Sequence, residues 1–375
     1  MKKRVLILRS NPIAPDPRVE KEARALQQAG YSVSALGWDR SGSLPQRDEK
    51  LGFECIRIPL QAGYGRGLGN LPQLLRWQWQ LWRWLIRNRW EFDVIHACDF
   101  DTILPALWCK TFFGKYLVYD IFDFYADHLR STPQWIVKLI RAVDLWSIGR
   151  ADGVILVDDA RRMQIAGARP QRLEVIYNSP EIVSMEGHGV EEEQRGGLSL
   201  AYVGLLQMER GLLEMFHVLQ RHLDWRLELA GFGGDEERIV ELVRSMPNVA
   251  WHGRVSYERA LELSRKADVL FATYDPLIPN HRYSSPNKVF EAMMLGKPVI
   301  VARNTNVDQI IETYDCGAVV PYGDEQALEE TLMCLAHDVD RRLLLGKNAR
   351  RAYEEQYGWE QMKKRLQAFY EAITS

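Results

Sequence analysis

The sequence predicts an α/β protein made of two doubly wound parallel-sheet domains in succession. Short apolar, β-branched runs alternate with helical patterns along the 375 residues, which is typical of parallel sheets covered by helices. A second series of such runs begins near Leu198, after a polar, glycine-bearing stretch at 184–197 that we interpret as a linker. Two such domains on a hinge would face each other across a cleft at the carboxyl ends of their strands.

The strands are predicted from runs of five to seven mostly apolar residues, which are too short for helices. In the first domain they lie at 4–8, 31–36, 55–60, 93–97, 116–120, 153–157 and 174–178. In the second they read LSLAYVG, RLELAG, NVAWHG, DVLFATY, PVIVA and GAVVPY. Between most of them the pattern is helical, as at 17–30, where Gly30 is suited to end the helix.

The expected division is an acceptor-binding first domain over 1–183 and a nucleotide-sugar-binding second domain over 198–358; the reasons for these roles follow below. The chain then ends in a helix over 359–375, containing WEQMKKRLQAFYEAI. That helix caps the second domain or crosses back to the first, because its periodicity fits both arrangements.

Composition places the chain among soluble globular proteins, with 46% hydrophobic and 26% charged residues. The five cysteines are scattered, odd in number and without C-x-x-C spacing, which argues against disulfides and a zinc site. No signal peptide and no apolar run long enough to span a bilayer are visible. We therefore expect a cytoplasmic protein, or one bound peripherally to the inner face of the cell membrane.

The net charge of −2 hides an asymmetry between the two halves. Residues 1–178 hold 26 Lys and Arg against 19 Asp and Glu, whereas residues 179–375 hold 22 against 31. The first half is therefore basic at +7 and the second acidic at −9. This asymmetry predicts that only the first half faces an anionic partner.

The stretch HRYSSPNKVFEAMMLGKPVI (281–300) predicts an anion site at the start of a helix. With Ser285 as N-cap and Pro286 at the first position, Lys288 adds its charge to the free N–H groups of the first turn. Glu291 follows on the same face, where it could accept from two ribose hydroxyls. The alternative is a normally capped helix with a surface Lys–Glu pair.

Further turns between strands and helices support a phosphate site. In AYVGLLQMERGLLEMF, Gly204 permits close backbone approach, and Arg210 before Gly211 is suited to bidentate phosphate binding. Gly253 and Arg254 follow a later strand and offer groups that could hold a base edge. Each turn by itself could be an ordinary βα connection with a solvated arginine, but several at one sheet edge are more specific.

These motifs resemble the retaining family-4 type of GT-B glycosyltransferases, the group 1 glycosyl transferases. The resemblance covers essentially the whole chain, and SPNKVFEAMMLGKPVI is its most specific motif, followed by YVG…ERG. It implies two Rossmann-like domains, with Glu291 holding the ribose and Arg210 and Lys288 the diphosphate. It further implies that the segment of Ser285, Pro286 and Asn287 closes on the phosphates and sugar, and that the segment of Gly253, Arg254 and Val255 holds the base.

Two positions depart from the family pattern in the donor half. Tyr283 stands where many members have a glutamate that contacts the sugar, and Leu205 replaces the usual arginine. In the first half, YDIFDFYADHL lies where relatives often read D-S-H-E-L-Y, so Phe122 replaces the histidine and Asp123 the glutamate. The candidate catalytic carboxylates are Asp123, Asp120 and Asp99, with helix capping or loop solvation as the alternative for each.

No metal and no cofactor are expected, because GT-B relatives need no D-x-D metal site and Asp99-Phe100-Asp101 fits a helix cap. GYGRGLGN (63–70) alternates glycines but never makes G-x-G-x-x-G, so we interpret it as a loop that receives the acceptor.

One helical stretch, LLRWQWQLWRWLIRNRW (74–90), combines arginines with tryptophans and is predicted to lie against anionic headgroups. The membrane-contacting residues expected there are Arg76, Trp77, Trp79, Arg83, Trp84 and Arg87. The alternative is a domain helix with a buried apolar face and solvated arginines.

The leading hypothesis is thus a retaining, metal-independent hexosyltransferase. It would move a sugar from a nucleotide diphosphate donor to a lipid-linked glycan or polysaccharide precursor. The partners expected are the nucleotide sugar, a glycan or glycolipid acceptor and an anionic membrane surface, but no nucleic acid. The alternatives are a nucleotide-sugar epimerase or a phosphorylase on the same fold, and a non-catalytic nucleotide-sugar-binding module.

Overall fold

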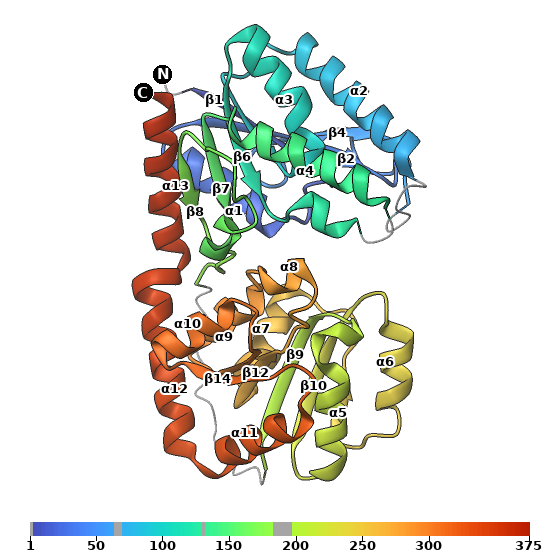
Figure 1. The fold of residues 1–375 in the computed structure, drawn as a ribbon, viewed down its shortest axis with the longest axis vertical. Coiled ribbons are helices and arrows are strands. Elements are labelled where there is room, and N and C mark those ends of the chain that lie inside the picture. The colour runs from blue at the N-terminus through green and yellow to red at the C-terminus, as the bar shows by residue number, and fades with distance from the viewer. Residues whose placement is uncertain (1–2, 64–69, 130–131, 183–196) are drawn as a thin grey trace. The chain divides into compact units, whose positions relative to one another are not determined.

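The computed structural model describes residues 3–63, 70–129, 132–182 and 197–375, which form two compact units (Figure 1). Unit 1 consists of Met1–Tyr177 together with Met362–Ser375, and unit 2 is the continuous stretch Asn178–Gln361. The predicted linker at 184–197 lies outside the described residues except for Gly197.

The sheet of unit 1 has eight strands in the order β3–β4–β2–β1–β5–β6–β7–β8. Among the described strands only the short edge strand β3 runs antiparallel to its neighbour. Its strands are β1 (Arg4–Arg9), β2 (Ser32–Asp39), β3 (Arg47–Asp48), β4 (Glu54–Pro59), β5 (Val94–Cys98), β6 (Tyr116–Ile121), β7 (Gly153–Leu156) and β8 (Leu173–Val175).

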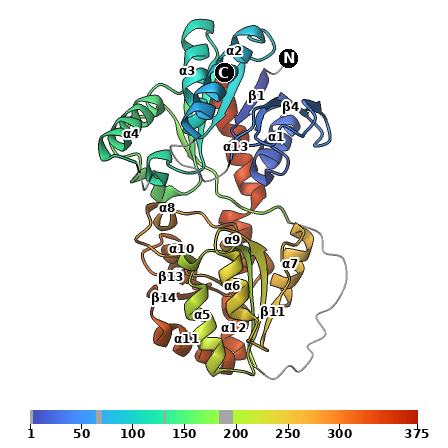
Figure 2. The ribbon, with the colours of Figure 1, turned by 90° about the vertical axis from the view of Figure 1, so that its right-hand side faces the viewer.

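Helices cover both faces of this sheet (Figure 2). One face carries α2 (Leu71–Arg87), α3 (Phe100–Phe113) and α4 (Gln134–Ile148), and α3 contacts both of the others. The opposite face carries α1 (Pro17–Gln28) and α13 (Trp359–Thr374). Two short 3-10 helices, η2 (Tyr125–His128) and η3 (Asp159–Arg162), follow β6 and β7.

The last helix, α13, completes the core of unit 1. Gly153 on β7 leaves room for it, because a Cβ there would lie 2.4 Å from the Ile373 Cδ1 atom and 2.5 Å from the Phe369 ring. The hydroxyl of Tyr370 lies 2.7 Å from Nδ1 of the buried His96. Of the two arrangements that the periodicity allowed for this helix, the structure has the one in which it joins the first unit from Met362 onward.

The sheet of unit 2 has six parallel strands in the order β11–β10–β9–β12–β13–β14. They are β9 (Ser199–Leu205), β10 (Arg226–Phe232), β11 (Val249–Trp251), β12 (Val269–Ala272), β13 (Val299–Ala302) and β14 (Gly317–Val320). The helical segments are η4 (Met208–Arg210), α5 (Leu212–Arg221), α6 (Glu236–Val243), α7 (Tyr257–Lys266), α8 (Pro279–Arg282), α9 (Asn287–Leu295), α10 (Val307–Tyr314), α11 (Glu325–His337), α12 (Val339–Ala352) and η5 (Tyr353–Tyr357).

The prediction of two parallel-sheet α/β domains is therefore confirmed, with every predicted strand present to within a few residues. The helix predicted at 17–30 is found at Pro17–Gln28. Within the ranges that the structure describes, no helix is both long enough and apolar enough to cross a lipid bilayer.

Candidate functional site

The connection between β9 and α5 ends in a glycine at a position where a side chain would be strained. Gly211 has φ +70°, and a Cβ there would lie 2.0 Å from the Thr273 Oγ1 atom. This close approach brings the start of α5 against the carboxyl end of β12. A Cβ on Gly204 would lie 3.1 Å from the Lys288 Nζ atom, so the bare backbone there leaves space beside the ammonium group.

Lys288 is the most unusual group of unit 2. Its Nζ atom is buried, has no hydrogen-bond partner among the described residues and lies 3.2 Å from the centroid of the Tyr202 ring. Burial, with a further contribution from the Arg210 charge, holds the pKa of Lys288 well below its ordinary value. An unpaired ammonium in such a place destabilises the protein, and a bound anion would remove that cost.

Two hydroxyl groups in the same unit are also buried without a partner in the described part of the chain. They are Thr273 Oγ1, which faces Gly211, and Ser285 Oγ, just before α9. Ser285 was expected to cap this helix, and that prediction is wrong. The helix begins at Asn287 with Pro286 as its N-cap residue and has no side-chain cap, so Lys288 lies in its first turn and the serine hydroxyl remains available.

Arg210 supplies a second positive charge at this end of the sheet. It immediately precedes Gly211, and its guanidinium lies 4.5 Å from the centroid of the Tyr274 ring. Its Nε donates to Gln207 Oε1 at 3.0 Å. Burial lowers its pKa, but the neighbouring Tyr274 and Tyr202 hydroxyl groups outweigh burial and raise it, so the guanidinium is always charged.

Glu291 lies one turn further along α9, and it has a partner that the sequence did not reveal. The half-exposed Tyr257, at the start of α7, hydrogen-bonds to the Glu291 carboxylate through its hydroxyl group. Burial raises the pKa of Tyr257, and the Glu291 charge raises it further. Tyr257 follows the helix-capping Ser256 and forms no recognisable sequence motif with Glu291, so it was not predicted from the sequence.

The predicted base-binding segment of Gly253, Arg254 and Val255 follows β11. The Gly253 carbonyl accepts from Gly231 N at 2.9 Å, which joins the two glycine turns. The Arg254 guanidinium lies 4.5 Å from the centroid of the Phe232 ring, and this ring is 45% exposed. Phe232, which the sequence analysis did not single out, therefore offers a flat face to solvent beside these turns.

Tyr283, in the position where the family pattern has a glutamate, lies half-buried at the end of α8. The Arg282 guanidinium is 5.6 Å from the centroid of its ring. The neighbouring Asn287 at the start of α9 is exposed.

In unit 1, Asp120 does not fit its predicted catalytic role. It is completely buried, and Arg18 donates to both of its oxygens at 3.1 to 3.2 Å. Burial raises the pKa of Asp120, but Arg18 and His96 outweigh burial and lower it. The carboxylate is held at the centre of a buried network, so we correct its assignment from catalytic to structural.

Asp99 is also held by protein groups. It forms an ion pair with Arg9, and its Oδ1 accepts from the backbone N–H groups of Phe122 and Asp123. Burial, only partly offset by Arg9, raises the pKa of Asp99 to about 6. The simpler interpretation, a carboxylate that fixes the loop after β6, fits this geometry better than general catalysis.

Asp123 differs from the other two because 46% of its side chain is exposed. Its Oδ1 accepts from Arg161 NH2 at 2.8 Å, and its backbone is fixed by Asp99. Phe122 beside it lies under two arginines, with Arg9 3.9 Å and Arg18 4.8 Å from the ring centroid. Of the three predicted acids, Asp123 is the most exposed, compared with 18% for the Asp99 side chain and a completely buried Asp120.

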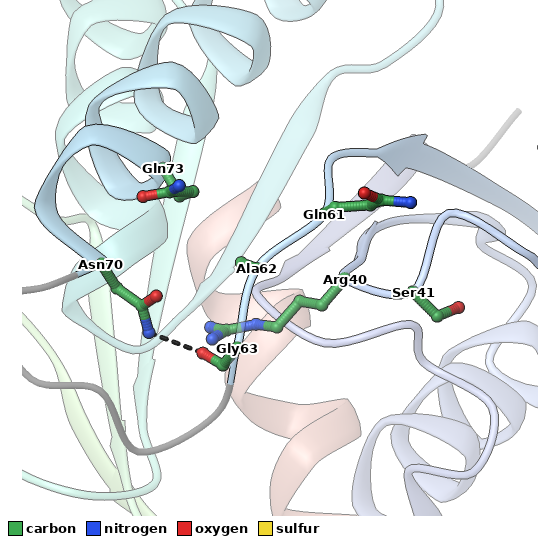
Figure 3. A pocket seen from close by; sticks show the side chains of 7 residues that line it. All are labelled: Arg40, Ser41, Gln61, Ala62, Gly63, Asn70 and Gln73. Carbon is green, nitrogen blue, oxygen red and sulfur yellow. Dashed lines mark hydrogen bonds between the residues drawn. The ribbon is translucent and has the colours of Figure 1, made fainter.

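A polar pocket of about 340 Å³ lies near the carboxyl ends of β2 and β4 (Figure 3). It is lined by Arg40, Ser41, Gln61, Ala62, Gly63, Asn70 and Gln73. Asn70 Nδ2 donates to the Gly63 carbonyl at 2.6 Å, which joins two of the lining residues. The predicted acceptor loop at 63–70 contributes its two end residues, while 64–69 lie outside the described residues.

One group of possible metal ligands exists among the described residues, formed by His96, Cys98 and Asp120. It is a poor cation site, because Arg18 already places a guanidinium on Asp120. Burial also raises the pKa of Cys98 well above its ordinary value, so the thiol stays protonated.

The predicted membrane helix is α2, and only part of its predicted face is exposed. Trp77 is completely buried against Trp38 and donates to the Asp101 carbonyl, so its assignment to a membrane surface is wrong. Trp84 is half-buried against the core. Arg76, Arg83, Arg87 and Trp79 are exposed.

Two successive parallel-sheet domains with a glycine-lined, cationic turn in the second are the features of GT-B glycosyltransferases, and this is the fold of the chain. Residues 15–179 match the model of a glycosyl transferase 4-like domain, and residues 198–338 match that of glycosyl transferases group 1. The chain therefore belongs to the group 1 GT-B glycosyltransferases.

Similar proteins include an uncharacterised glycosyltransferase of Methanocaldococcus jannaschii, 20% identical over 240 residues that make up 60% of each chain. The phosphatidyl-myo-inositol mannosyltransferase of Mycobacterium leprae is 23% identical over 313 residues, 78% of this chain and 76% of that protein. Among solved structures, sucrose-phosphate synthase from Thermosynechococcus elongatus has a TM-score of 0.78 at 14% identity over 99% of both chains. HepE of Anabaena in complex with UDP-glucose has a TM-score of 0.72 at 16% identity, over 99% of this chain and 100% of that one.

Proposed function

We propose that the protein is a retaining glycosyltransferase that moves a hexose from a nucleotide diphosphate donor to a lipid-linked acceptor. The observation that carries the donor half is the buried Lys288 ammonium, unpaired in the described structure, in the first turn of α9. Arg210 adds a charge, and Thr273 and Ser285 add unpartnered hydroxyls. Together these groups suit a diphosphate better than any uncharged ligand.

The remaining donor contacts are assigned from the positions of the other candidate residues in unit 2. Glu291, one turn from Lys288, is placed to accept from the ribose hydroxyls, and Gly253, Arg254 and Val255 would hold the base beside Phe232. Tyr283 and Asn287 would face the sugar. The binding of UDP-glucose by HepE supports a uridine diphosphate sugar as the first donor to test.

The reaction forms a bond between an acceptor oxygen and the anomeric carbon, and it breaks the bond from that carbon to the β-phosphate oxygen. The acceptor proton passes to the leaving diphosphate on the same face of the sugar, which retains the anomeric configuration. Lys288 and Arg210 would stabilise the charge that develops on the leaving group. Since these two residues supply that stabilisation, the proposed reaction needs neither a metal nor another cofactor.

Unit 1 would bind the acceptor through the polar pocket that contains Arg40. A lipid-linked glycan fits the basic charge of this half, and a relative named as a phosphatidyl-myo-inositol mannosyltransferase supports a glycolipid acceptor. An enzyme in glycolipid or polysaccharide biosynthesis would then work in the cytoplasm, peripherally on the inner face of the cell membrane.

The Asp123→Asn variant is expected to lower turnover about 100-fold, because we propose that this carboxylate orients the acceptor hydroxyl. It should also lower thermal stability, since it removes the charged partner of the buried Arg161. The measurement is release of nucleoside diphosphate from UDP-, GDP- and ADP-sugars, with a detergent-solubilised lipid extract as acceptor source. Asp159→Asn is the control, since Asp159, the first residue of η3, is also an exposed carboxylate paired with an arginine.

Full turnover by the Asp123 variant would remove this residue from the mechanism. If the wild-type protein binds a nucleotide sugar but releases no nucleoside diphosphate with any acceptor, the chain is a binding module and the proposed transfer is wrong.

Tyr257→Phe is expected to weaken nucleoside diphosphate binding about fivefold, because the loss of one hydrogen bond to Glu291 costs about 1 kcal/mol. Calorimetric titration with ribose and 2′,3′-dideoxyribose forms of the same nucleotide tests the cause. If Tyr257 positions Glu291 for the ribose hydroxyls, only the ribose form loses affinity. Equal losses for both forms would show that the hydroxyl merely stabilises α7.

A further inference from the structure

The helices on one face of the unit 1 sheet leave large apolar side chains exposed. We define the α2–α4 face as the outer side of α2, α3 and α4 (Figure 2). Its exposed apolar residues are Leu71, Leu75 and Trp79 of α2, Trp90 just after α2, Phe112 of α3, and Trp135, Leu139, Ala142 and Trp146 of α4. Large apolar side chains gathered on one exposed face often mark an interaction site.

The spacing shows that these residues form continuous stripes. On α2 the large exposed apolar residues recur every four positions, and on α4 the exposed apolar residues follow at intervals of four, three and four. In each helix the other side already faces the core, where Trp77, Leu81 and Leu85 of α2 are completely buried. Both helices therefore carry apolar residues on the side that packs on the sheet and also on the exposed side. Packing on the sheet requires only the first of these.

Aromatic rings connect α2 to α3 across the face. Trp79 stacks on Trp82 at 5.1 Å between ring centroids, Trp82 contacts Trp108 at 5.2 Å, and Trp108 contacts Phe112 at 4.7 Å. Trp79 and Phe112, at the two ends of this series, are 58% and 64% exposed. The rings make one aromatic surface.

The exposed charges of α2 and α4 have a single sign. Residues 71–90 are all described and contain no acidic residue, whereas Arg76, Arg83 and Arg87 are exposed. On α4, Lys138 is exposed, and the one acidic residue, Asp144, is buried and accepts from the Tyr119 hydroxyl. Tryptophans and leucines flanked by arginines are suited to the boundary between anionic headgroups and acyl chains.

We propose that the α2–α4 face docks on the surface of an anionic lipid bilayer. A second copy of the chain is a poorer occupant, because a two-fold interface would place this patch against itself. The exposed arginines of α2 in one copy would then meet those of the other, and neither α2 nor α4 has an exposed carboxylate to pair with them. Anionic headgroups supply the opposite charge along the whole face.

The polar pocket of unit 1 adds a reason for this occupant. Asn70 and Gln73, which line the pocket, alternate with Leu71 and Leu75 at the first turns of α2. A molecule with a lipid chain in the bilayer could thus place its polar head in the pocket. This last point rests on the proposed function, whereas bilayer docking itself does not.

Sedimentation with lipid vesicles tests the proposal on the full chain. The wild-type protein is expected to bind vesicles of phosphatidylglycerol and phosphatidylcholine at least tenfold more tightly than vesicles of phosphatidylcholine alone. A Trp79→Ser/Trp135→Ser double variant should lose most of this binding, and each of Arg76→Gln and Arg83→Gln should weaken it about fivefold. The matched control is Leu223→Ser/Leu343→Ser, which changes two residues of unit 2 that are 65% and 64% exposed.

Unchanged vesicle binding by the tryptophan variant, or no preference of the wild type for anionic lipid, would overturn the proposal. A dimer in solution that depends on Trp79 and Trp135 would also overturn it, in favour of a second copy. Nucleoside diphosphate binding is measured in parallel without vesicles. If the wild-type protein binds no nucleoside diphosphate, the proposed function is contradicted but the docking result stands. The two failures are therefore distinguishable.

Discussion

Lys288→Met is expected to reduce nucleoside diphosphate affinity roughly 100-fold, about 2.7 kcal/mol, because it removes a charged donor from the diphosphate. The same substitution should stabilise the unliganded protein by about 1–3 kcal/mol, since it replaces a buried, unpaired ammonium by an apolar side chain of similar length. Thermal unfolding with and without nucleotide measures both effects, because a ligand raises the unfolding temperature only where it binds.

The matched control is Lys297→Met. Burial also lowers the pKa of Lys297, but this lysine follows the end of α9 and is outside the proposed site. Its variant should bind nucleotide normally. If Lys288→Met also binds normally, or if it destabilises the unliganded protein, the diphosphate site is wrongly placed.

The lowered pKa of Lys288 gives the expected pH dependence a definite sign. Between the folded-state pKa and the unfolded value of about 10.4, the unfolded chain binds the extra proton, so the free energy of unfolding rises with pH. The stability gap between the Lys288→Met variant and the wild type should therefore narrow as the pH rises toward 10. Nucleotide affinity of the wild type should fall over the same window, because the diphosphate needs the ammonium form.

Asp120→Ala is expected to destabilise unit 1 by about 3–5 kcal/mol, because it leaves the buried Arg18 guanidinium without its bidentate partner. Denaturant unfolding followed by tryptophan fluorescence measures the loss. Asp93→Asn is the control. It breaks the exposed pair with Arg4 and should cost no more than about 1 kcal/mol.

Because Asp120→Ala would lower activity through unfolding whichever role the residue has, Asp120→Asn is the variant that separates the structural role from the catalytic one. It keeps the shape of the side chain and should still destabilise the protein measurably. Wild-type stability combined with lost turnover in Asp120→Asn would return this residue to the catalytic group.

The strand pattern predicted the fold well, because buried parallel strands are short apolar runs and the chain has little else of that kind. The strand it missed, β3, has two residues, Arg47 and Asp48, and pairs at an edge where no apolar run is needed. The residue range of the last helix was predicted correctly. Which domain it packs against could be decided only from tertiary contacts, such as that between Tyr370 and His96.

The candidate donor residues could be proposed from local spacing, because Arg210 at the end of η4 and Lys288 in the first turn of α9 lie next to glycine and proline signals. Spacing did not separate the buried Asp120, which lies within β6, from the more exposed Asp123, which follows that strand by two residues. Trp77 shares its side of the helix with Leu81 and Leu85 at four-residue intervals, and that interval could have indicated burial. Tyr257 is distant in sequence from Glu291 and could be found only from the folded chain.

The discontinuous make-up of unit 1 has a consequence for how the chain matures on the ribosome. Unit 2 is one continuous segment, so its core can close once Gln361 has emerged. The first 177 residues, although synthesised earlier, must wait for Phe369, Tyr370 and Ile373 before β7 is covered and His96 receives its hydroxyl partner. The N-terminal half is therefore the last part of the protein to reach its native state, and a chain cut after Tyr177 would leave bare the side of β7 that α13 covers.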